Sequence, residues 1–165
     1  MSVFATEQWV PAPLAEVFLF FAEPQNLLRV TPPSARAELT AIKLVPPPAR
    51  PGIDLNGLAG VGTEITIALR PFAWLPLRQE WATRIVEFEW EHHFRDVHIR
   101  GPFRRFSHLH SFRAEEREGV SGTVVGDRIE ARTGFGPPAD AFARRQLARV
   151  FAYRQARLAE LFPAR

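Results

Sequence analysis

The sequence predicts an α+β domain in which an antiparallel sheet packs against one long C-terminal helix. Two patterns support this prediction. Several segments between residues 2 and 133 alternate apolar and polar side chains, which is the period of half-buried strands. The last stretch, residues 140–162, carries apolar residues at helical spacing instead. A single amphipathic helix must bury its apolar face, and the apolar face of the sheet is the surface available to it.

The beginning of the chain predicts one strand followed by short helical segments. Residues 2–10 form the expected first strand. Pro13 suits the start of a helix over residues 14–22, because the first helical turn needs no N–H from it. Pro24 ends that helix, residues 25–28 add a short turn, and the Thr31-Pro32-Pro33 sequence is expected to prevent further helix.

Six more strands are expected after this point. The Pro- and Gly-rich loop over residues 46–60 is long for a compact domain, which is typical of a mobile or functional segment. Residues 71–76 and 115–122 form the expected turns on either side of the central strands. Trp74, in the first of these turns, is a candidate for the rim of an entrance. The six expected strands cover residues 36–45, 61–70, 77–88, 93–100, 101–112 and 123–133.

Composition sets limits on function. The chain of 165 residues has the length and the apolar content (46 %) of one domain, residues 1–165, with a sizeable core. It has no cysteine, which agrees with a cytoplasmic location and excludes thiolate metal sites. No signal peptide and no membrane span are expected, because the apolar runs are too short. The net charge of +3 comes from arginines that are spread among acidic residues, so no nucleic-acid surface is predicted.

The stretch 101–112 is the most informative part of the sequence. At the period of a strand, Phe106, His108, His110 and Phe112 share one face, and serines and arginines take the other. The aromatic face should point inward. Two histidines in its middle predict either a polar network within the core or the wall of a pocket.

The C-terminal helix carries a charged residue where an apolar one is expected. Positions every 100° place Arg154 near the centre of the apolar stripe. A buried guanidinium costs several kcal/mol unless it is paired or reaches water. Arg154 therefore either bridges to a core carboxylate or lines a wet cavity and holds a ligand anion. The stripe itself consists of Leu147, Val150, Phe151, Leu158, Leu161 and Phe162, and Asp140 is expected to cap the helix start.

A set of short motifs in a fixed order points to a known superfamily. The motifs are Trp9-Val-Pro-Ala-Pro13 before Val17-Phe18, Asn26-Leu27, Thr31-Pro32-Pro33, Gly101-Pro102-Phe103-Arg104 before the His108 strand, Phe135-Gly136-Pro137, and Arg145-Gln146-Leu147 with Tyr153-Arg154. With them, the chain resembles the START/Bet v 1-like (SRPBCC) superfamily, in its ligand-binding polyketide cyclase/dehydrase-like branch. The resemblance covers nearly the full length.

The resemblance implies the helix-grip fold, a curved seven-stranded antiparallel sheet around a long C-terminal helix. It also implies a central cavity that takes lipids, sterols, polyketides or other apolar molecules. Relatives sometimes occur fused to an epimerase-like dehydrogenase, so an epimerase-like protein or a second copy of the chain is the expected protein partner. The chain has no Gly-x-Gly-x-x-Gly motif, and no cofactor is predicted. No catalytic set is carried over.

The two histidines allow several kinds of chemistry. Residues at positions i and i+2 of a strand lie on one side, close enough to chelate a metal with Asp96 or Asp127 as a third ligand. The same rings could instead titrate within a cavity or form a satisfied core pair. We predict no metal. Asp96, Asp127, His108, His110 and Arg154 are expected to form one polar island, either a general acid–base site or, by default, a structural network.

Three functions are compatible with these patterns. The first is binding of a small hydrophobic or amphipathic molecule between the sheet and the helix, with Trp81, Phe106, Phe112 and Phe151 as apolar walls. The second is an enzyme of the cyclase/dehydratase type that uses cavity His or Asp as acid–base. The third is an interaction module whose cavity is vestigial.

Overall fold

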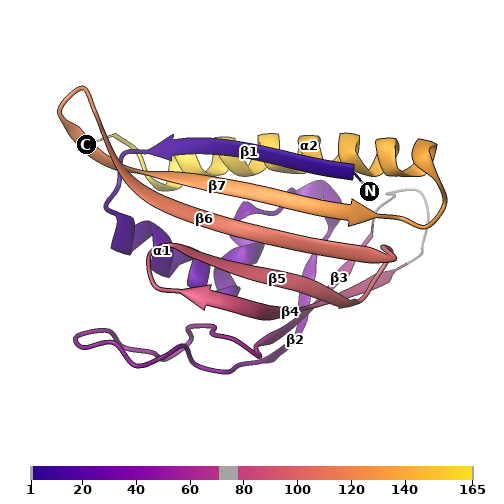
Figure 1. Cartoon of the computed structure of the whole chain (residues 1–165), viewed down its shortest axis with the longest axis horizontal. Helices are drawn as coiled ribbons and strands as arrows, with labels where there is room; N and C mark the ends of the chain where they lie inside the picture. The colour runs from indigo at the N-terminus through magenta and orange to yellow at the C-terminus, as the bar shows by residue number, and fades with distance from the viewer. Residues whose placement is uncertain (1, 71–77, 165) are drawn as a thin grey trace.

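The computed structural model describes residues 2–70 and 78–164, and these form one antiparallel sheet with a long helix across it (Figure 1). The strand order is β1-β7-β6-β5-β4-β3-β2. The predicted helix-grip fold is thereby confirmed. The elements are β1 Ser2–Val10, α1 Leu14–Ala22, the 3-10 helices η1 Pro24–Val30 and η2 Pro33–Ala35, β2 Glu38–Lys43, β3 Glu64–Leu69, β4 Gln79–Glu89, β5 His93–Arg100, β6 Arg105–Arg117, β7 Val120–Arg132 and α2 Pro137–Leu161.

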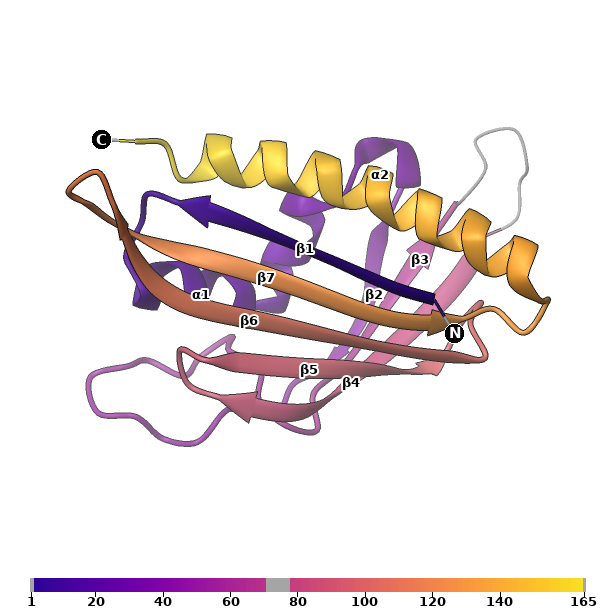
Figure 2. The same cartoon turned by 45° about the horizontal axis from the view of Figure 1, so that its top comes forward.

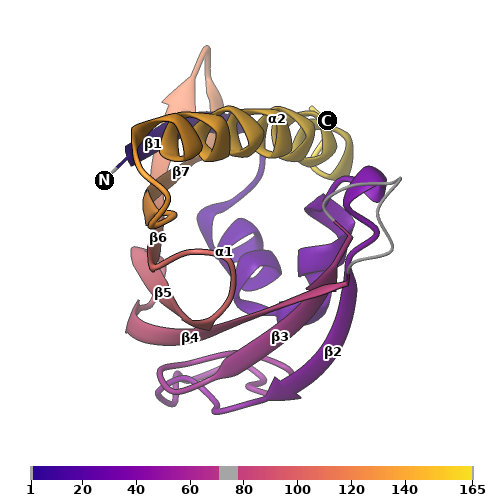
Figure 3. The ribbon, with the colours of Figure 1, turned by 90° about the vertical axis from the view of Figure 1, so that its right-hand side faces the viewer.

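The sheet curves so that its concave face encloses the helices. In the end-on view, the strands run in an arc from β7 to β2, α2 lies across the open side, and α1 lies within the arc (Figure 3). The turned view shows α2 running beside β1 for most of the length of that strand (Figure 2). No helix in the described part of the chain has both the length and the apolar character needed to cross a bilayer.

The hairpin between β6 and β7 is tighter than predicted. The expected turn covered residues 115–122, but the strands continue until only Glu118 and Gly119 remain between them. Both residues have positive φ, 52° and 77°, as a two-residue turn of this hand requires. The tight turn fixes the register of the two strands over thirteen pairs, from Arg117 opposite Val120 to Arg105 opposite Arg132.

Two other expectations are corrected at element ends. Pro33 does not prevent helix but begins the short η2, because its missing N–H is not needed in the first turn. The helix α2 begins at Pro137, so Asp140 lies within the first turn and does not cap it. Its Oδ1 accepts hydrogen bonds from the backbone N–H and the hydroxyl of Thr133, at 2.8 and 2.7 Å. The turn predicted over residues 71–76, with Trp74, lies outside the described residues.

The two edge strands of the sheet are covered or interrupted. At one edge, α2 lies against β1, and Gln155 donates a hydrogen bond to the Thr6 hydroxyl at 2.7 Å. At the other edge, β2 has a register shift between Leu39 and Ala41. The long loop before β3 ends in contact with α1, where the Ala59 N–H donates to the Ala22 carbonyl at 2.8 Å.

The apolar core is divided in two along β6. One cluster surrounds Phe18, which is fully buried and contacts the rings of Phe94 and Phe112. The other contains Phe106 and Phe151. Between them, the inner face of β6 carries two histidines in place of apolar side chains. The polar side chains described next therefore lie in the middle of the core.

Candidate functional site

Five polar side chains from four elements meet on the concave face of the sheet. His108 and His110 come from β6, Asp96 from β5, Asp127 from β7 and Arg154 from α2. The strand register pairs Asp96 with His108 and Asp127 with His110, so each histidine lies directly opposite a carboxylate. All are buried except Asp96, which is half-buried. The predicted polar island is thus assembled in the structure.

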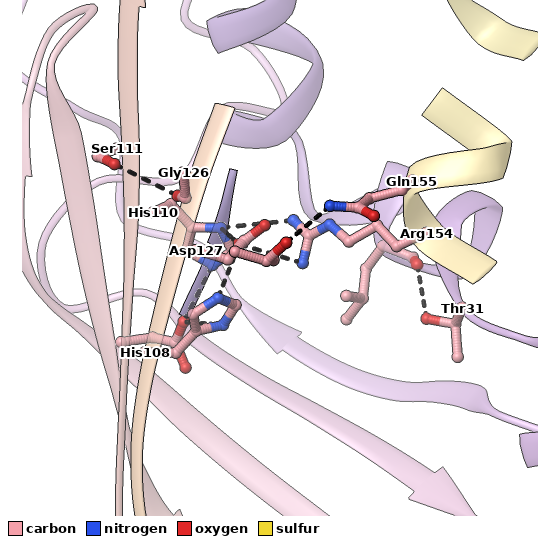
Figure 4. A network of polar contacts seen from close by, with 11 residues as sticks. Thr31, His108, His110, Ser111, Gly126, Asp127, Arg154 and Gln155 are labelled. Atoms are coloured by element: carbon pink, nitrogen blue, oxygen red, sulfur yellow. Dashed lines mark hydrogen bonds and ion pairs between the residues drawn. The ribbon is translucent and has the colours of Figure 1, made fainter. Parts of the chain in front are cut away.

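Asp127 is the centre of this group and lies between the imidazoles and the guanidinium (Figure 4). Its Oδ1 is 2.8 Å from His108 Nε2 and 3.2 Å from His110 Nδ1. The same oxygen is 3.5 Å from Arg154 Nη1. One buried carboxylate oxygen is therefore shared by three neighbouring nitrogen groups.

This environment shifts two ionisation equilibria. Burial acts to raise the pKa of Asp127, but the charge of Arg154 and the hydrogen bonds from both histidines outweigh it and hold that pKa well below its usual range. Burial, assisted by the neighbouring His110, lowers the pKa of His108 from 6.5 to about 4, although Asp127 and Asp96 oppose this shift. At neutral pH, Asp127 is a carboxylate and the ring of His108 is uncharged.

Arg154 lies where it can both pair with a core carboxylate and face the cavity. Its guanidinium pairs with Asp127, which is the predicted bridge to a core carboxylate. It also lies over the rings of Phe21 and Phe151, at 4.7 and 5.2 Å from their centroids, and lines the central cavity. Its buried Nε has no hydrogen-bond partner among the described residues. The pairing and the exposure to the cavity are therefore not exclusive alternatives.

A cavity of about 260 Å³ lies between the sheet and α2. Apolar side chains from α1, the η1–η2 segment, β3, β4 and α2 contribute to its wall, and the polar group occupies one part of it. Seven of the nine predicted site residues line the cavity: Trp81, Asp96, Phe106, His108, His110, Phe151 and Arg154.

Two predicted site residues are not part of the cavity wall. Asp127 lies behind the histidines and reaches the wall only through them and Arg154. Phe112 packs in the first core cluster, with its ring 5.1 Å from that of Phe18 and 5.3 Å from that of Phe21. The alternation along β6 placed Phe112 on the correct face, but the face extends beyond the end of the cavity.

One wall of the cavity was missed from the sequence. The segment η1–η2, with residues such as Asn26, Val30 and Thr31, closes the side between β3 and α2. Asn26 is buried and donates to the Phe20 carbonyl at 3.0 Å, which ties this segment to α1. The sequence predicted a short helical turn over residues 25–28, but it gave no sign that this segment contacts the cavity. A second hollow of about 450 Å³ lies on the outside of the segment and shares Thr31 and Pro32 with the cavity.

Solved structures share this fold. The protein XoxI from Bacillus cereus is 12 % identical, with a TM-score of 0.64 over 98 % of this chain and 96 % of that one. Protein Ms6760 from Mycobacterium smegmatis is 15 % identical, with a TM-score of 0.67 over 99 % and 91 %. Ara h 8.0201, a Bet v 1 family protein, is 16 % identical, with a TM-score of 0.56 over 96 % and 98 %.

Comparison at the level of sequence gives no match. A scan of protein-family models finds none for this chain, and a search of curated proteins finds none either. The structural likeness, at these identities, establishes a shared Bet v 1-like fold and neither a ligand nor an activity.

Proposed function

We propose that the protein binds a small amphipathic molecule in the cavity between the sheet and α2. The observation that carries this proposal is the distribution of polar groups on the cavity wall. Asp96, His108, His110 and Arg154 converge at one place, and the rest of the wall is largely apolar. Ligand sites in proteins have this composition, with an apolar body and a few convergent polar groups.

The size of the cavity limits the ligand. Its 260 Å³ equals the volume of roughly nine water molecules at about 30 Å³ each. Pockets for drug-sized ligands are larger, at roughly 300–1,000 Å³. Among the apolar molecules implied by the resemblance, a compact body of one or two rings fits best.

The polar group of the ligand is expected to be an oxygen acceptor. The guanidinium of Arg154 is a permanent hydrogen-bond donor at the cavity wall. Its ion pair with Asp127 is long, at 3.5 Å, and leaves the group able to interact with a ligand as well. A carbonyl or carboxylate oxygen placed there would accept from the guanidinium. The apolar body would lie against Ile65, Ile67 and Trp81.

Naphthalene-2-carboxylate and naphthalene are suitable probes, and isothermal titration calorimetry gives their affinities. Ile67→Trp fills the cavity and should weaken binding of both probes at least tenfold. Arg154→Met should weaken only the carboxylate, because naphthalene makes no hydrogen bond to it. Val86→Trp, on the exposed face of β4, is the matched control and should bind like the unmodified protein. Equal losses in Ile67→Trp and Val86→Trp would contradict the proposal.

An acid–base enzyme of the cyclase/dehydratase type is the second candidate. It is favoured by the contact of each cavity histidine with a carboxylate, which is the arrangement of a general acid–base group. Because the pKa of His108 is held near 4, we assign proton transfer in this alternative to His110. The imidazole would take a proton from the carbon next to a ligand carbonyl, and the enolate oxygen would be stabilised by Arg154.

The ketone 2-tetralone tests this alternative, because its C1 protons exchange with D2O through the enol. We expect exchange, followed by NMR, to be accelerated by the protein and to return to the rate in buffer with His110→Gln. Binding of the ketone should persist in that variant. His92→Gln, at an exposed position, should leave the acceleration unchanged. If the accelerated exchange survives in His110→Gln, this residue is not the base.

The third hypothesis is an interaction module that docks a second copy of the chain or an epimerase-like protein. It requires a collapsed cavity, and the volume of 260 Å³ favours ligand binding over it.

We keep a cytoplasmic location as part of the proposed function, since a chain without cysteine needs no oxidising compartment.

A further inference from the structure

Although the sequence alone predicts no metal, we propose that Asp96, His108 and His110 bind a divalent metal ion at the cavity wall. One donor atom from each of the three residues lies within 4.8 Å of the other two. Asp96 Oδ2 is 3.4 Å from His110 Nε2 and 3.8 Å from His108 Nδ1. Ligand atoms around a tetrahedral ion with bonds of roughly 2.0–2.1 Å are about 3.3–3.4 Å apart. The two distances from Asp96 Oδ2 are at or slightly above this spacing.

Asp127 gives the two rings the orientation that a metal requires. Its Oδ1 accepts from His108 Nε2 at 2.8 Å and lies 3.2 Å from His110 Nδ1. With those two nitrogens protonated, the remaining ring nitrogens present lone pairs toward the Asp96 carboxylate. Three acceptors then face one another, and a cation between them removes the repulsion. Carboxylates that hold the outer nitrogen of a ligating histidine are typical of metal centres.

A hydrogen-bonded network without metal is the competing arrangement. Arg154 Nη2 is 3.4 Å from His110 Nδ1 and could donate to it. The opposite ring nitrogen would then carry the proton and donate to Asp96. The two arrangements differ in one property that can be measured, which is the affinity of the cluster for a metal ion.

The donor set and the charges indicate the kind of ion. Two imidazoles and one carboxylate suit Zn²⁺ and related first-row ions, and a three-residue site leaves a coordination position open. Asp96, Asp127 and Arg154 together carry one negative charge, so a divalent ion leaves one positive charge at the wall. The open position would therefore favour an anionic oxygen. The preference of the open position for an anionic oxygen rests on the proposed function, whereas the metal site itself does not.

Titration of Zn²⁺ into protein treated with EDTA tests the site, with Co²⁺ as a spectroscopic probe of coordination. We expect one ion per chain and an affinity lowered by about 100-fold or more in Asp96→Asn and in His110→Gln. Visible absorption bands of bound Co²⁺ should report a low-coordinate site and disappear in both variants. Using two variants protects the test against a failure of either one to fold.

The control addresses a second group of histidines. His92 and His93 lie near Glu87 and Glu89 on the surface, at 3.5–3.7 Å, and could take up Zn²⁺ adventitiously. The double variant His92→Gln/His93→Gln should therefore bind the ion as the unmodified protein does. The proposal is overturned if this double variant loses the ion, if Asp96→Asn keeps it, or if Zn²⁺ does not bind. Failure of the naphthalene probes to bind would reject the ligand proposal and leave this one intact.

Discussion

Asp127→Asn is expected to lower the free energy of unfolding by about 3–5 kcal/mol at pH 7. The substitution keeps the shape of the side chain but removes its charge. Arg154, of which 7 % is exposed, would then be a buried guanidinium without a counter-ion. The amide oxygen of asparagine can still accept hydrogen bonds from the histidines, but these bonds lose the contribution of the carboxylate charge. Urea denaturation of the metal-free protein in EDTA, followed by far-UV circular dichroism, measures the difference.

Glu7→Gln provides the matched control. Glu7 also pairs with an arginine, Arg113, at 3.1 Å, but both side chains are more than half exposed. Exposed pairs contribute about 0–1 kcal/mol, so this variant should stay within that range. If Asp127→Asn loses no more stability than Glu7→Gln, the buried pair is not a major determinant of stability.

Removing the partner charge should restore much of the loss. In the double variant Asp127→Asn/Arg154→Met, no buried charge is left unpaired, and methionine replaces most of the arginine volume. Replacement of a buried ion pair by uncharged groups is often close to neutral. The double variant is therefore expected to be more stable than Asp127→Asn alone. A loss equal to the sum of the two single losses would mean that the residues do not interact.

The metal-free protein is expected to lose about 3 kcal/mol of stability as the pH falls from 6.5 to 4, through His108 alone. The pKa of this residue is about 4 in the folded chain, against 6.5 for an unperturbed histidine. Between these values the unfolded chain binds a proton that the folded chain excludes, so acid favours unfolding. Each pH unit between the two pKa values contributes about 1.4 kcal/mol, and the effect is full below pH 4 and absent above 6.5.

The titratable groups that face His108 are Asp96, Asp127 and His110, and the lowered pKa of His108 already contains their effects. The Arg154 guanidinium pairs with Asp127 on the other side of the group. Urea denaturation at a series of pH values in EDTA measures the loss of stability. The variant His108→Gln should show a smaller decrease between pH 6.5 and 4, because glutamine takes up no proton. His92→Gln, exposed to solvent, should keep the original profile. Coincident profiles for His108→Gln and the unmodified protein would show that His108 is not the group responsible.

The sequence determines the fold more completely than it determines the strand ends. In the strand expected over residues 61–70, Ile65, Ile67 and Leu69 occupy alternate positions, and all three line the cavity. A period of two leaves only one choice of inner face once the core side is known. Element ends were less certain. The turn at Glu118 was expected to be eight residues long, since glutamate is rarely found at positive φ and gave no signal of a two-residue turn.

The same uncertainty limited the prediction of the site. His108, His110 and Arg154 could be chosen from single elements, because each breaks an apolar pattern. The distances from His108 and His110 to Asp127 depend on the register of β6 with β7, which a two-residue turn fixes and a longer turn would leave open. The closure of the cavity by η1 and η2 depends on contacts between distant segments, and the local sequence of prolines contains no such information.

The interrupted edge at β2 bears on how the protein behaves at high concentration. An uninterrupted edge strand offers a regular row of N–H and C=O groups to which another chain can add in register, and this is a route to aggregation. The shift between Leu39 and Ala41 breaks the row, and the charges of Glu38 and Lys43 lie at its two ends. At the opposite edge, α2 lies against β1. A chain with these two edges can keep a cavity between sheet and helix without offering its sheet to a neighbouring chain.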